Sequence, residues 1–271
     1  MNHNLKLDPV WLNIDKPIGF SSAKAVAIVK RITGAKKVGH AGTLDPFASG
    51  VLPIALNKAT KTAEKLVNAR KKYLFQISWG EFRDTDDVEG QVTESNLARP
   101  KTSEIISALP FFVGKIKQTP SRFSAIKING RRAYELARQN VEFEVPMREI
   151  EIFSLKLISN NADYAELEIE CSKGTYVRSL AHDLSKRVLV CGYVSKLTRL
   201  LVGKFLYEKT ISLDALKLLT TYGGRFSDGS LLSLQDVLDQ GQLGDISLAK
   251  SRSITIDFPS SFKSYGLRRN S

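Results

Sequence analysis

Residues Val38–Pro53 read VGHAGTLDPFASGVLP, and they place a single carboxylate, Asp45, in a loop interrupted by glycine and proline. Glycine permits positive φ and lets the backbone approach a large neighbour closely. Pro46 disfavours helical geometry at Asp45. An Asp in such a loop is usually a turn residue that bonds its own backbone. Because His40 lies five residues earlier and basic clusters occur elsewhere, the loop is also a candidate catalytic site.

The composition favours a folded protein with a polyanionic partner. Hydrophobic residues make up 42% of the 271 residues, which is enough for a sizeable core. The chain has 40 Lys and Arg against 28 Asp and Glu, a formal charge of +12. Nucleic acid is therefore the first candidate partner and an acidic membrane surface the second. No stretch approaches the roughly 20 apolar residues of a membrane span, and the N-terminus lacks the apolar segment of a signal peptide.

The basic residues gather in three blocks, over 58–72, 114–138 and 171–204, each of which contains one acidic residue. The acids concentrate between the blocks. An evenly solvated surface would mix the two signs more, so this pattern indicates one positive face on a folded protein. Aromatic residues in or beside the blocks, Tyr73 and Tyr176 among them, could stack on unpaired bases, although each alone is more often a core residue.

Hydrophobic periodicity predicts a mixed α/β chain. Apolar runs and alternation predict strands over 10–15, 51–56, 73–79, 150–158 and 165–171, the last two as a pair. Helical patterns cover 59–69, 103–109, 131–139 and 175–187. Another helix begins at a cap formed by Ser21 or Ser22 and ends at Gly34. Asn129–Gly130 is a strong turn signal.

Neither a metal nor a cofactor is expected. The three histidines have no metal-ligand spacing. Cys171 and Cys191 lack metal or redox spacing, and we expect them to be small buried residues in a reduced, cytoplasmic protein.

Two further segments resemble ligand-binding motifs but lack residues that those motifs require. Gly34 and Gly39 have the spacing of a phosphate-binding loop, but His40 and Ala41 replace its Lys and Ser or Thr. Asp84–Gly90 resembles a calcium loop but has Glu where the loop's Gly belongs, so an acidic turn is expected instead. Any enzyme here must work with side chains alone.

Several segments, in order along roughly residues 10–240, together resemble the tRNA pseudouridine synthases of the TruB type. Beside the Asp45 loop, the matching segments are Asp15–Ser22, Lys71–Tyr73, Gly80–Gly90, Gly114–Gly130, Ala133–Arg138, Cys171–Leu180 and Cys191–Gly203. Ser121–Arg122 departs from the pattern, because the family commonly has a second proline there.

The resemblance implies an α+β pseudouridine synthase fold, with a mixed, largely antiparallel central sheet flanked by helices and a catalytic cleft. The catalytic domain, with a tRNA-binding insertion, would cover residues 1–240. Residues 241–271 would be a short basic tail that lacks a full PUA domain. The partner would be the T stem-loop of tRNA, and the protein a cytoplasmic monomer.

The implied activity is isomerisation of uridine to pseudouridine at T-loop position 55 of tRNA. Two alternatives remain. One is the same chemistry on another RNA, such as a ribosomal or guide-directed uridine. The other is a non-catalytic chaperone that flips bases and refolds tRNA.

By the same resemblance, Asp45 attacks the ribose or stabilises a developing cation there. Arg178 would form an ion pair with Asp45. The alternative without a catalytic role is an ion pair of Arg178 with Asp183 or a pair at the surface. Tyr73 would stack on the target base and could transfer a proton, unless it is an ordinary core residue.

Reaching a stacked uridine requires base flipping, which costs roughly a few kcal/mol. The resemblance implies that His40 fills the vacated space, although a structural histidine is the alternative, and that Tyr176 and Leu197 are walls of the uracil pocket. Contacts with the RNA backbone are expected on charge alone from Lys16, Lys61, Arg122 and Lys127.

Overall fold

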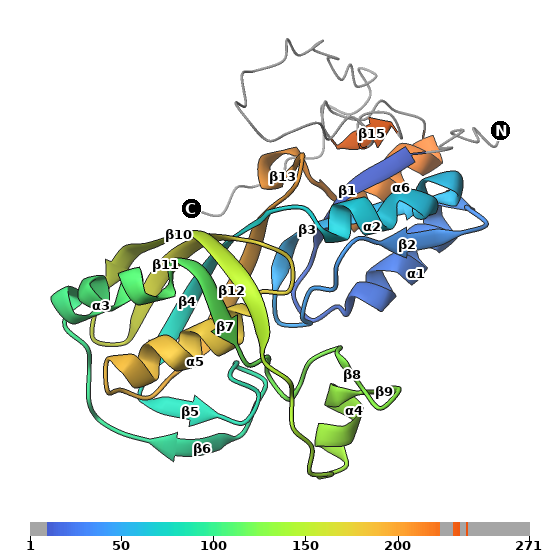
Figure 1. The fold of residues 1–271 in the computed structure, drawn as a ribbon. Helices are drawn as coiled ribbons and strands as arrows, with labels where there is room; N and C mark the ends of the chain where they lie inside the picture. The colour runs from blue at the N-terminus through green and yellow to red at the C-terminus, as the bar shows by residue number, and fades with distance from the viewer. Residues whose placement is uncertain (1–9, 223–229, 234–236, 238–271) are drawn as a thin grey trace.

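The computed structural model describes residues 10–222, 230–233 and 237. Its main feature is a mixed sheet in which the described strands follow the order β14-β1-β3-β12-β4-β11-β10-β7. These strands are β14 (Ile211–Ser212), β1 (Val10–Lys16), β3 (Ser49–Leu56), β12 (Gly192–Val202), β4 (Lys71–Trp79), β11 (Tyr164–Cys171), β10 (Arg148–Asn160) and β7 (Gly114–Gln118). Three short strands join it at the side: β2 (Val38–His40), β13 (Phe205–Leu206) and β15 (Leu231–Ser233). The curved sheet extends through most of the described molecule (Figure 1).

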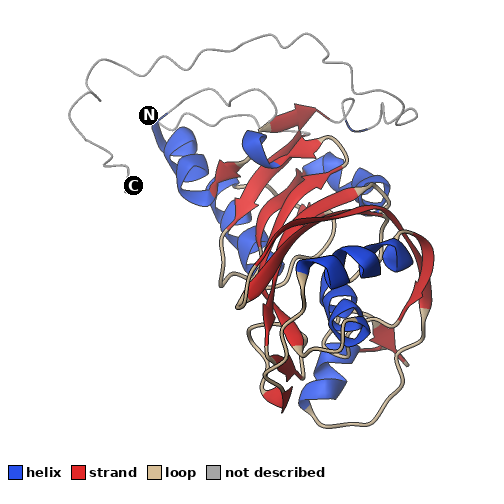
Figure 2. Cartoon of the chain, turned by 90° about the vertical axis from the view of Figure 1, so that its left-hand side faces the viewer, coloured by secondary structure: helices blue, strands red, loops and turns tan. Residues whose placement is uncertain are grey.

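The sheet is largely antiparallel, as the sequence predicts. Along the order above, β1–β14 and β3–β12 are the parallel neighbours, and the remaining pairs are antiparallel. The parallel contact between β3 and β12 consists of two residue pairs, Thr198 with Ser49 and Arg199 with Gly50. It forms a narrow seam between the part of the sheet made by β14, β1 and β3 and the part made by β12, β4, β11, β10 and β7. Helices pack on this sheet, which Figure 2 shows from the side.

The N-terminal part of the sheet is covered by α1 (Ser22–Thr33). The Ser21 hydroxyl accepts a hydrogen bond from the backbone N–H of Lys24, and Gly34 ends the helix with φ of 65°. Both ends therefore lie where the sequence predicts. Ala25 and Val29 pack with Leu12 and Leu52 in one apolar core.

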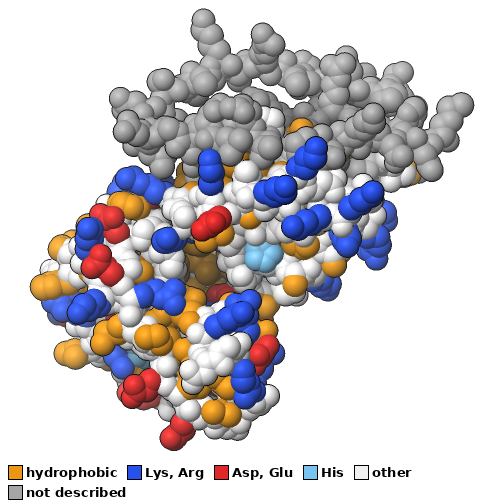
Figure 3. Space-filling view, turned by 45° about the vertical axis from the view of Figure 1, so that its right-hand side comes forward, with side chains coloured by type: hydrophobic (Ala, Val, Ile, Leu, Met, Phe, Trp, Pro, Cys, Tyr) orange, Lys and Arg blue, Asp and Glu red, His pale blue; other side chains and the backbone are white. Residues whose placement is uncertain are grey.

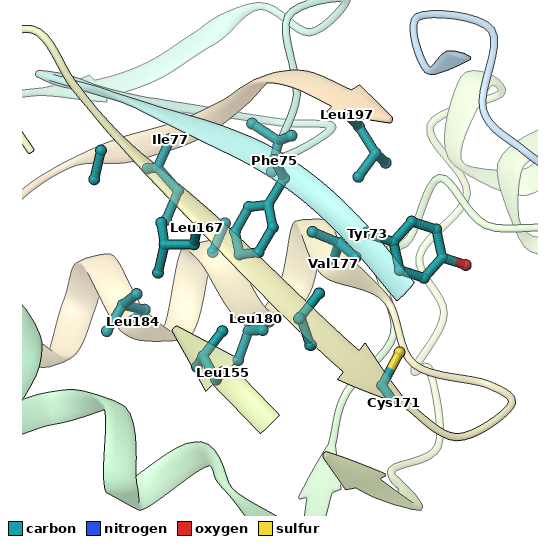
Figure 4. Packing of buried hydrophobic residues seen from close by; sticks show 14 of the residues in the cluster. Tyr73, Phe75, Ile77, Leu155, Leu167, Cys171, Val177, Leu180, Leu184 and Leu197 are labelled. Carbon is teal, nitrogen blue, oxygen red and sulfur yellow. The ribbon is translucent and has the colours of Figure 1, made fainter. Parts of the chain in front are cut away.

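The second core lies under α5 (Val177–Arg187). Leu180 and Leu184 pack there against Phe75 of β4 and Leu167 of β11 (Figure 4). The predicted pair of strands over 150–158 and 165–171 is confirmed as β10 and β11, with β10 extending to Asn160.

The other described elements are short. They are η1 (Asn57–Thr62), α2 (Ala63–Val67), α3 (Thr102–Ala108), η2 (Leu109–Phe112), α4 (Ala133–Arg138), η3 (Tyr207–Lys209) and α6 (Leu213–Tyr222), with two small sheets formed by β5 (Glu81–Arg83) with β6 (Val92–Ser95) and by β8 (Lys127–Ile128) with β9 (Arg131–Arg132). No described helix has both the length and the hydropathy needed to cross a membrane.

Several predicted boundaries are wrong. The helix predicted over 59–69 is the 3-10 turn η1 followed by five residues of α-helix. The helix predicted over 131–139 loses its first two residues to β9, because the turn at Asn129 (φ 48°) and Gly130 (φ 84°) closes a hairpin. Both cysteines are free and buried, as expected. The expected tail over 241–271 lies outside the described residues.

Candidate active site

A cavity of about 480 Å³ opens beside the seam between β3 and β12. Its lining brings together five of the residues predicted for the site, namely Asp45, Tyr73, Tyr176, Arg178 and Leu197. Figure 3 shows a hollow on one face of the molecule, with Lys and Arg side chains around it. The cavity therefore combines two carboxylates, Asp45 and Glu149, with two phenols, guanidinium groups and a basic rim.

The Asp45 loop connects β2 to β3 and is anchored on both sides of the carboxylate. Leu44 and Phe47 are buried, and the Ser22 hydroxyl bonds both the N–H (2.9 Å) and the carbonyl (3.0 Å) of Leu44. The backbone N–H of Ala48 donates to the carbonyl of Asp45 at 3.1 Å, so the turn is closed on itself. The side chain of Asp45 remains 33% exposed, which leaves its carboxylate accessible from the cavity.

Arg178 meets Asp45 side on. Its Nε lies 2.9 Å from Oδ2 and its Nη2 lies 3.4 Å from Oδ1 of the carboxylate. This two-point contact fixes the plane of the carboxylate. The structure thus pairs Arg178 with Asp45 and not with Asp183.

The rest of the Arg178 guanidinium is held by one buried carboxylate and two backbone carbonyls. Nη1 lies 3.2 Å from Oδ2 of Asp87 and donates to the carbonyl of Thr85 at 2.9 Å. Nη2 donates to the carbonyl of Phe123 at 3.1 Å. Since Arg178 is only 3% exposed, these contacts hold a buried cation in a single orientation toward Asp45.

Asp87 is a site residue that the sequence does not predict, because the pattern of its segment indicates only an acidic turn. Burial raises the pKa of the Asp87 carboxyl, whereas Arg178 and hydrogen bonds from Thr85 and the N–H of Glu89 oppose the rise. One signal was available: a buried guanidinium has five donors, more than a single carboxylate can accept. The turn therefore supplies the second carboxylate of an Asp45–Arg178–Asp87 chain.

Tyr73 and Leu197 face the cavity from neighbouring strands. Tyr73 is 7% exposed, and its phenol oxygen points away from the apolar cluster (Figure 4). Burial raises the pKa of Tyr73 to about 12, against the opposing charge of Arg199, so the phenol keeps its proton at neutral pH. Tyr176 is fixed through its backbone, since the Gln118 amide accepts from its N–H (2.8 Å) and donates to its carbonyl (3.0 Å).

Arg199 is the second residue that sequence reasoning missed as part of the site. It is 1% exposed and lines the cavity. Its Nε donates to the carbonyl of Val51 (2.7 Å), Nη1 to that of Thr43 (3.3 Å) and Nη2 to that of Gly42 (3.2 Å). Arg199 therefore fastens both ends of the Asp45 loop to β12.

The expected phosphate contact of Lys16 is wrong. Lys16 is fully buried, and its ammonium donates to the carbonyls of Pro17 (2.9 Å), Phe20 (2.6 Å) and Pro46 (3.2 Å). Burial lowers the pKa of Lys16 to about 8. The residue braces the backbone after Asp45 and has no surface to offer to RNA.

The other expected RNA contacts lie outside the cavity lining. Lys61 and Lys127 are exposed, on η1 and β8. Arg122 is exposed but donates to the carbonyl of Val141 at 3.2 Å and lies over the ring of Phe143. His40 lies on β2, where burial lowers the pKa of its imidazole and favours the neutral form.

Comparison with solved structures defines the class of protein to which this fold belongs. The chain superposes on the Cbf5 pseudouridine synthase chain of a Cbf5-Nop10-Gar1 complex with a TM-score of 0.66 at 26% identity, over 84% of this chain and 61% of that one. A chain of an H/ACA RNP bound to a substrate RNA containing 2'-deoxyuridine gives a TM-score of 0.63 at 24% identity, over 84% and 60%. The fold is that of the pseudouridine synthases.

Sequence comparison gives the family. Residues 30–177 match the model of the TruB family pseudouridylate synthase (N terminal domain). The tRNA pseudouridine synthase B of Caulobacter vibrioides is 47% identical over 230 residues, which cover 84% of this chain and 74% of that relative. The enzyme of the same name from Bradyrhizobium diazoefficiens is 47% identical over 234 residues, covering 84% and 68%. This chain belongs to the TruB family of pseudouridine synthases.

Proposed function

We propose that this protein isomerises uridine to pseudouridine at the T-loop position 55 of tRNA, with Asp45 acting on the ribose. Family membership supports the isomerisation, and the names of its relatives support tRNA as the substrate. The observation that carries the role of Asp45 is its two-point contact with the buried Arg178 at the cavity wall. T-loop position 55 comes from the motif resemblance.

The isomerisation moves the glycosidic bond from N1 to C5 of the base. The bond between C1′ and N1 breaks, and its electron pair stays on the base while the Asp45 carboxylate attacks C1′ or stabilises the cation that develops there. The base turns, C5 bonds to C1′, and the carboxylate is released. C5 then loses its proton and N1 gains one, so no atom is added or removed.

The cavity walls suit a flipped uracil. Tyr73 and Leu197 offer one aromatic and one aliphatic surface, and the neutral Tyr73 phenol can give or accept a hydrogen bond. A flipped base leaves a gap in its own stack, for which we propose the largely neutral ring of His40 as filler. The exposed Lys61 and Lys127 side chains would contact phosphates around the cavity.

Two other functions compete with this one. A guide-directed enzyme would modify uridines in other RNAs, and a chaperone would remodel tRNA without changing it. The relatives at 47% identity, which are both named for tRNA, favour tRNA over a guided target. The charged Asp45–Arg178 pair, placed in the cavity, favours chemistry over remodelling alone.

The test uses an unmodified tRNA transcript and maps pseudouridine after incubation with the wild type and with Asp45→Asn. We expect product at the T-loop uridine from the wild type alone, with tRNA affinity unchanged in the variant. Asp163→Asn is the control, because this exposed carboxylate lies beyond the opposite end of β11 from the cavity. Equal product from both proteins would refute the role of Asp45, and tight binding without product from the wild type would favour the chaperone.

A further inference from the structure

One wall of the cavity carries two buried cations. Arg199 is 1% exposed and Lys71 is 8% exposed, and both line the cavity next to Tyr73. They lie close together, since a methyl group added at Gly42 would be 3.8 Å from Nη1 of Arg199 and 3.9 Å from Cε of Lys71.

Within the described part of the chain, neither cation forms an ion pair with a carboxylate. Arg199 donates to three backbone carbonyls, and the Lys71 ammonium donates to those of Val67 and Ala69, each at 2.8 Å. These carbonyls accept hydrogen bonds from the two cations but do not cancel their charge. A buried cation without a counter-ion is unfavourable, and it is best compensated by an anion that enters the site.

The third buried cation of the lining, Arg178, has a different balance of charge. It lies between the two carboxylates Asp45 and Asp87, so its charge is matched within the protein. The cavity thus offers a carboxylate, Asp45, suited to a cationic sugar, and two cations without a counter-ion among the described residues, Arg199 and Lys71, suited to an anion.

The proposed reaction produces such an anion. When the bond between C1′ and N1 breaks, its electron pair remains on uracil, and the negative charge spreads over N1, O2 and O4. The detached base must stay in the cavity while it turns. We propose that Arg199, assisted by Lys71, is a catalytic residue that stabilises the negative charge on the detached uracil. This inference rests on the proposed function, because it assigns a further group to the same reaction.

The experiment compares two RNAs in single turnovers, one with uridine and one with 5-fluorouridine at the target position. Fluorine withdraws electrons, so the detached 5-fluorouracil anion needs less help from the protein. The measured quantity is the rate at which the target N-glycoside disappears from a nuclease digest. With uridine, Arg199→Gln should lower this rate about 100-fold. With 5-fluorouridine the loss should be no more than about tenfold.

Arg199→Lys separates charge from loop positioning. It keeps the cation but cannot reach three carbonyls at once, so we expect it to restore at least about tenfold of the rate lost in Arg199→Gln. A purely positioning role predicts equal losses with both RNAs and no recovery with lysine. Either of those results, or an unchanged rate in Arg199→Gln, would overturn the proposal.

Lys71→Gln serves as the second variant, because the carbonyl partners of Lys71, Val67 and Ala69, lie outside the Asp45 loop. It should show a smaller loss, about tenfold with uridine, that again shrinks with 5-fluorouridine. Thermal unfolding and RNA affinity are measured for every variant. A wild type that makes no pseudouridine would refute the proposed function itself, whereas an active wild type with equally active variants would refute only this inference.

Discussion

Nη1 of Arg178 lies 3.2 Å from Oδ2 of Asp87, and the side chains of both residues are 4% exposed. The same guanidinium contacts the carboxylate of Asp45, which is 33% exposed. The buried pair of Arg178 and Asp87 therefore positions the accessible carboxylate of Asp45. A rigid second carboxylate behind the guanidinium limits how far Arg178 can follow a substrate.

Asp87→Asn tests this relationship. The variant keeps an oxygen that can accept from Arg178 but loses the charge, so the guanidinium can shift within its pocket. We expect the single-turnover rate to fall about 10²-fold and the free energy of unfolding to fall by about 1–3 kcal/mol. RNA affinity should not change. Asp84→Asn is the control, because Asp84 lies in the same turn but is exposed; a comparable rate loss there would argue against a specific role for Asp87.

The buried Lys71 should make stability depend on alkaline pH. Burial, reinforced by the charge of Arg199, lowers the pKa of Lys71 to about 8 in the folded protein, against about 10.4 in an unfolded chain. Between these values the unfolded chain binds more protons, so the contribution of Lys71 to stability rises with pH. Chemical unfolding should show the wild type gaining up to about 3 kcal/mol relative to Lys71→Met from pH 7 to pH 10.5.

The exposed Lys65 provides the comparison for that experiment. The stability difference between the wild type and Lys65→Met should not vary over the same range of pH. If the Lys71→Met difference is equally flat, the ammonium of Lys71 has an ordinary pKa.

The two exposed lysines proposed to contact phosphates should affect the salt dependence of binding. Each of Lys61→Ala and Lys127→Ala should reduce the slope of log affinity against log salt concentration by about one, because one fewer counterion is released. Lys186→Ala should leave the slope unchanged, since Lys186 lies at the far end of α5 from the cavity. Fluorescence anisotropy with labelled tRNA at several salt concentrations measures the slope, and an unchanged slope in the first two variants would remove them from the interface.

Gly50 should tolerate no side chain. Its φ is +100°, and an added methyl group would lie 2.9 Å from the backbone nitrogen of Arg199 on the adjacent strand. We expect Gly50→Ala to lower the free energy of unfolding by at least about 3 kcal/mol, from backbone strain and overpacking together. Gly34→Ala isolates the strain, because Gly34 has φ of +65° and open space around it, and it should cost about 1–2 kcal/mol. Equal losses of stability in the two variants would mean that β3 and β12 can move apart to accommodate the added methyl group.

Local signals in the sequence were sufficient for the elements that depend on local contacts. The Ser21 cap, the Gly34 terminator and the Asn129–Gly130 turn all lie where predicted, because each acts within a few residues of itself. The strand β12 was not predicted. Its neighbours β3 and β4 are distant in sequence, and its two register irregularities break the alternation of side chains.

The candidate site was predictable in part for the same reason. Asp45 and Arg178 carry motif signals, whereas the positions of Arg199 and Asp87 depend on contacts across more than 90 residues. Lys16 was misassigned because charge suggests exposure, and only the tertiary structure supplies the three carbonyls that allow its burial.

The seam between β3 and β12 has a consequence for synthesis on the ribosome. β3 and β4 are consecutive large strands in the chain, yet β12, which ends at Val202, lies between them in the sheet. In a nascent chain, the edges of β3 and β4 that pair with β12 therefore lack their partner while about a hundred further residues are made. Both edges are exposed to wrong partners during that time. The Asp45 loop is fastened to β12 only once Arg199 has been made, so the emerging protein should carry no catalytic activity until nearly all of the described sheet has been translated.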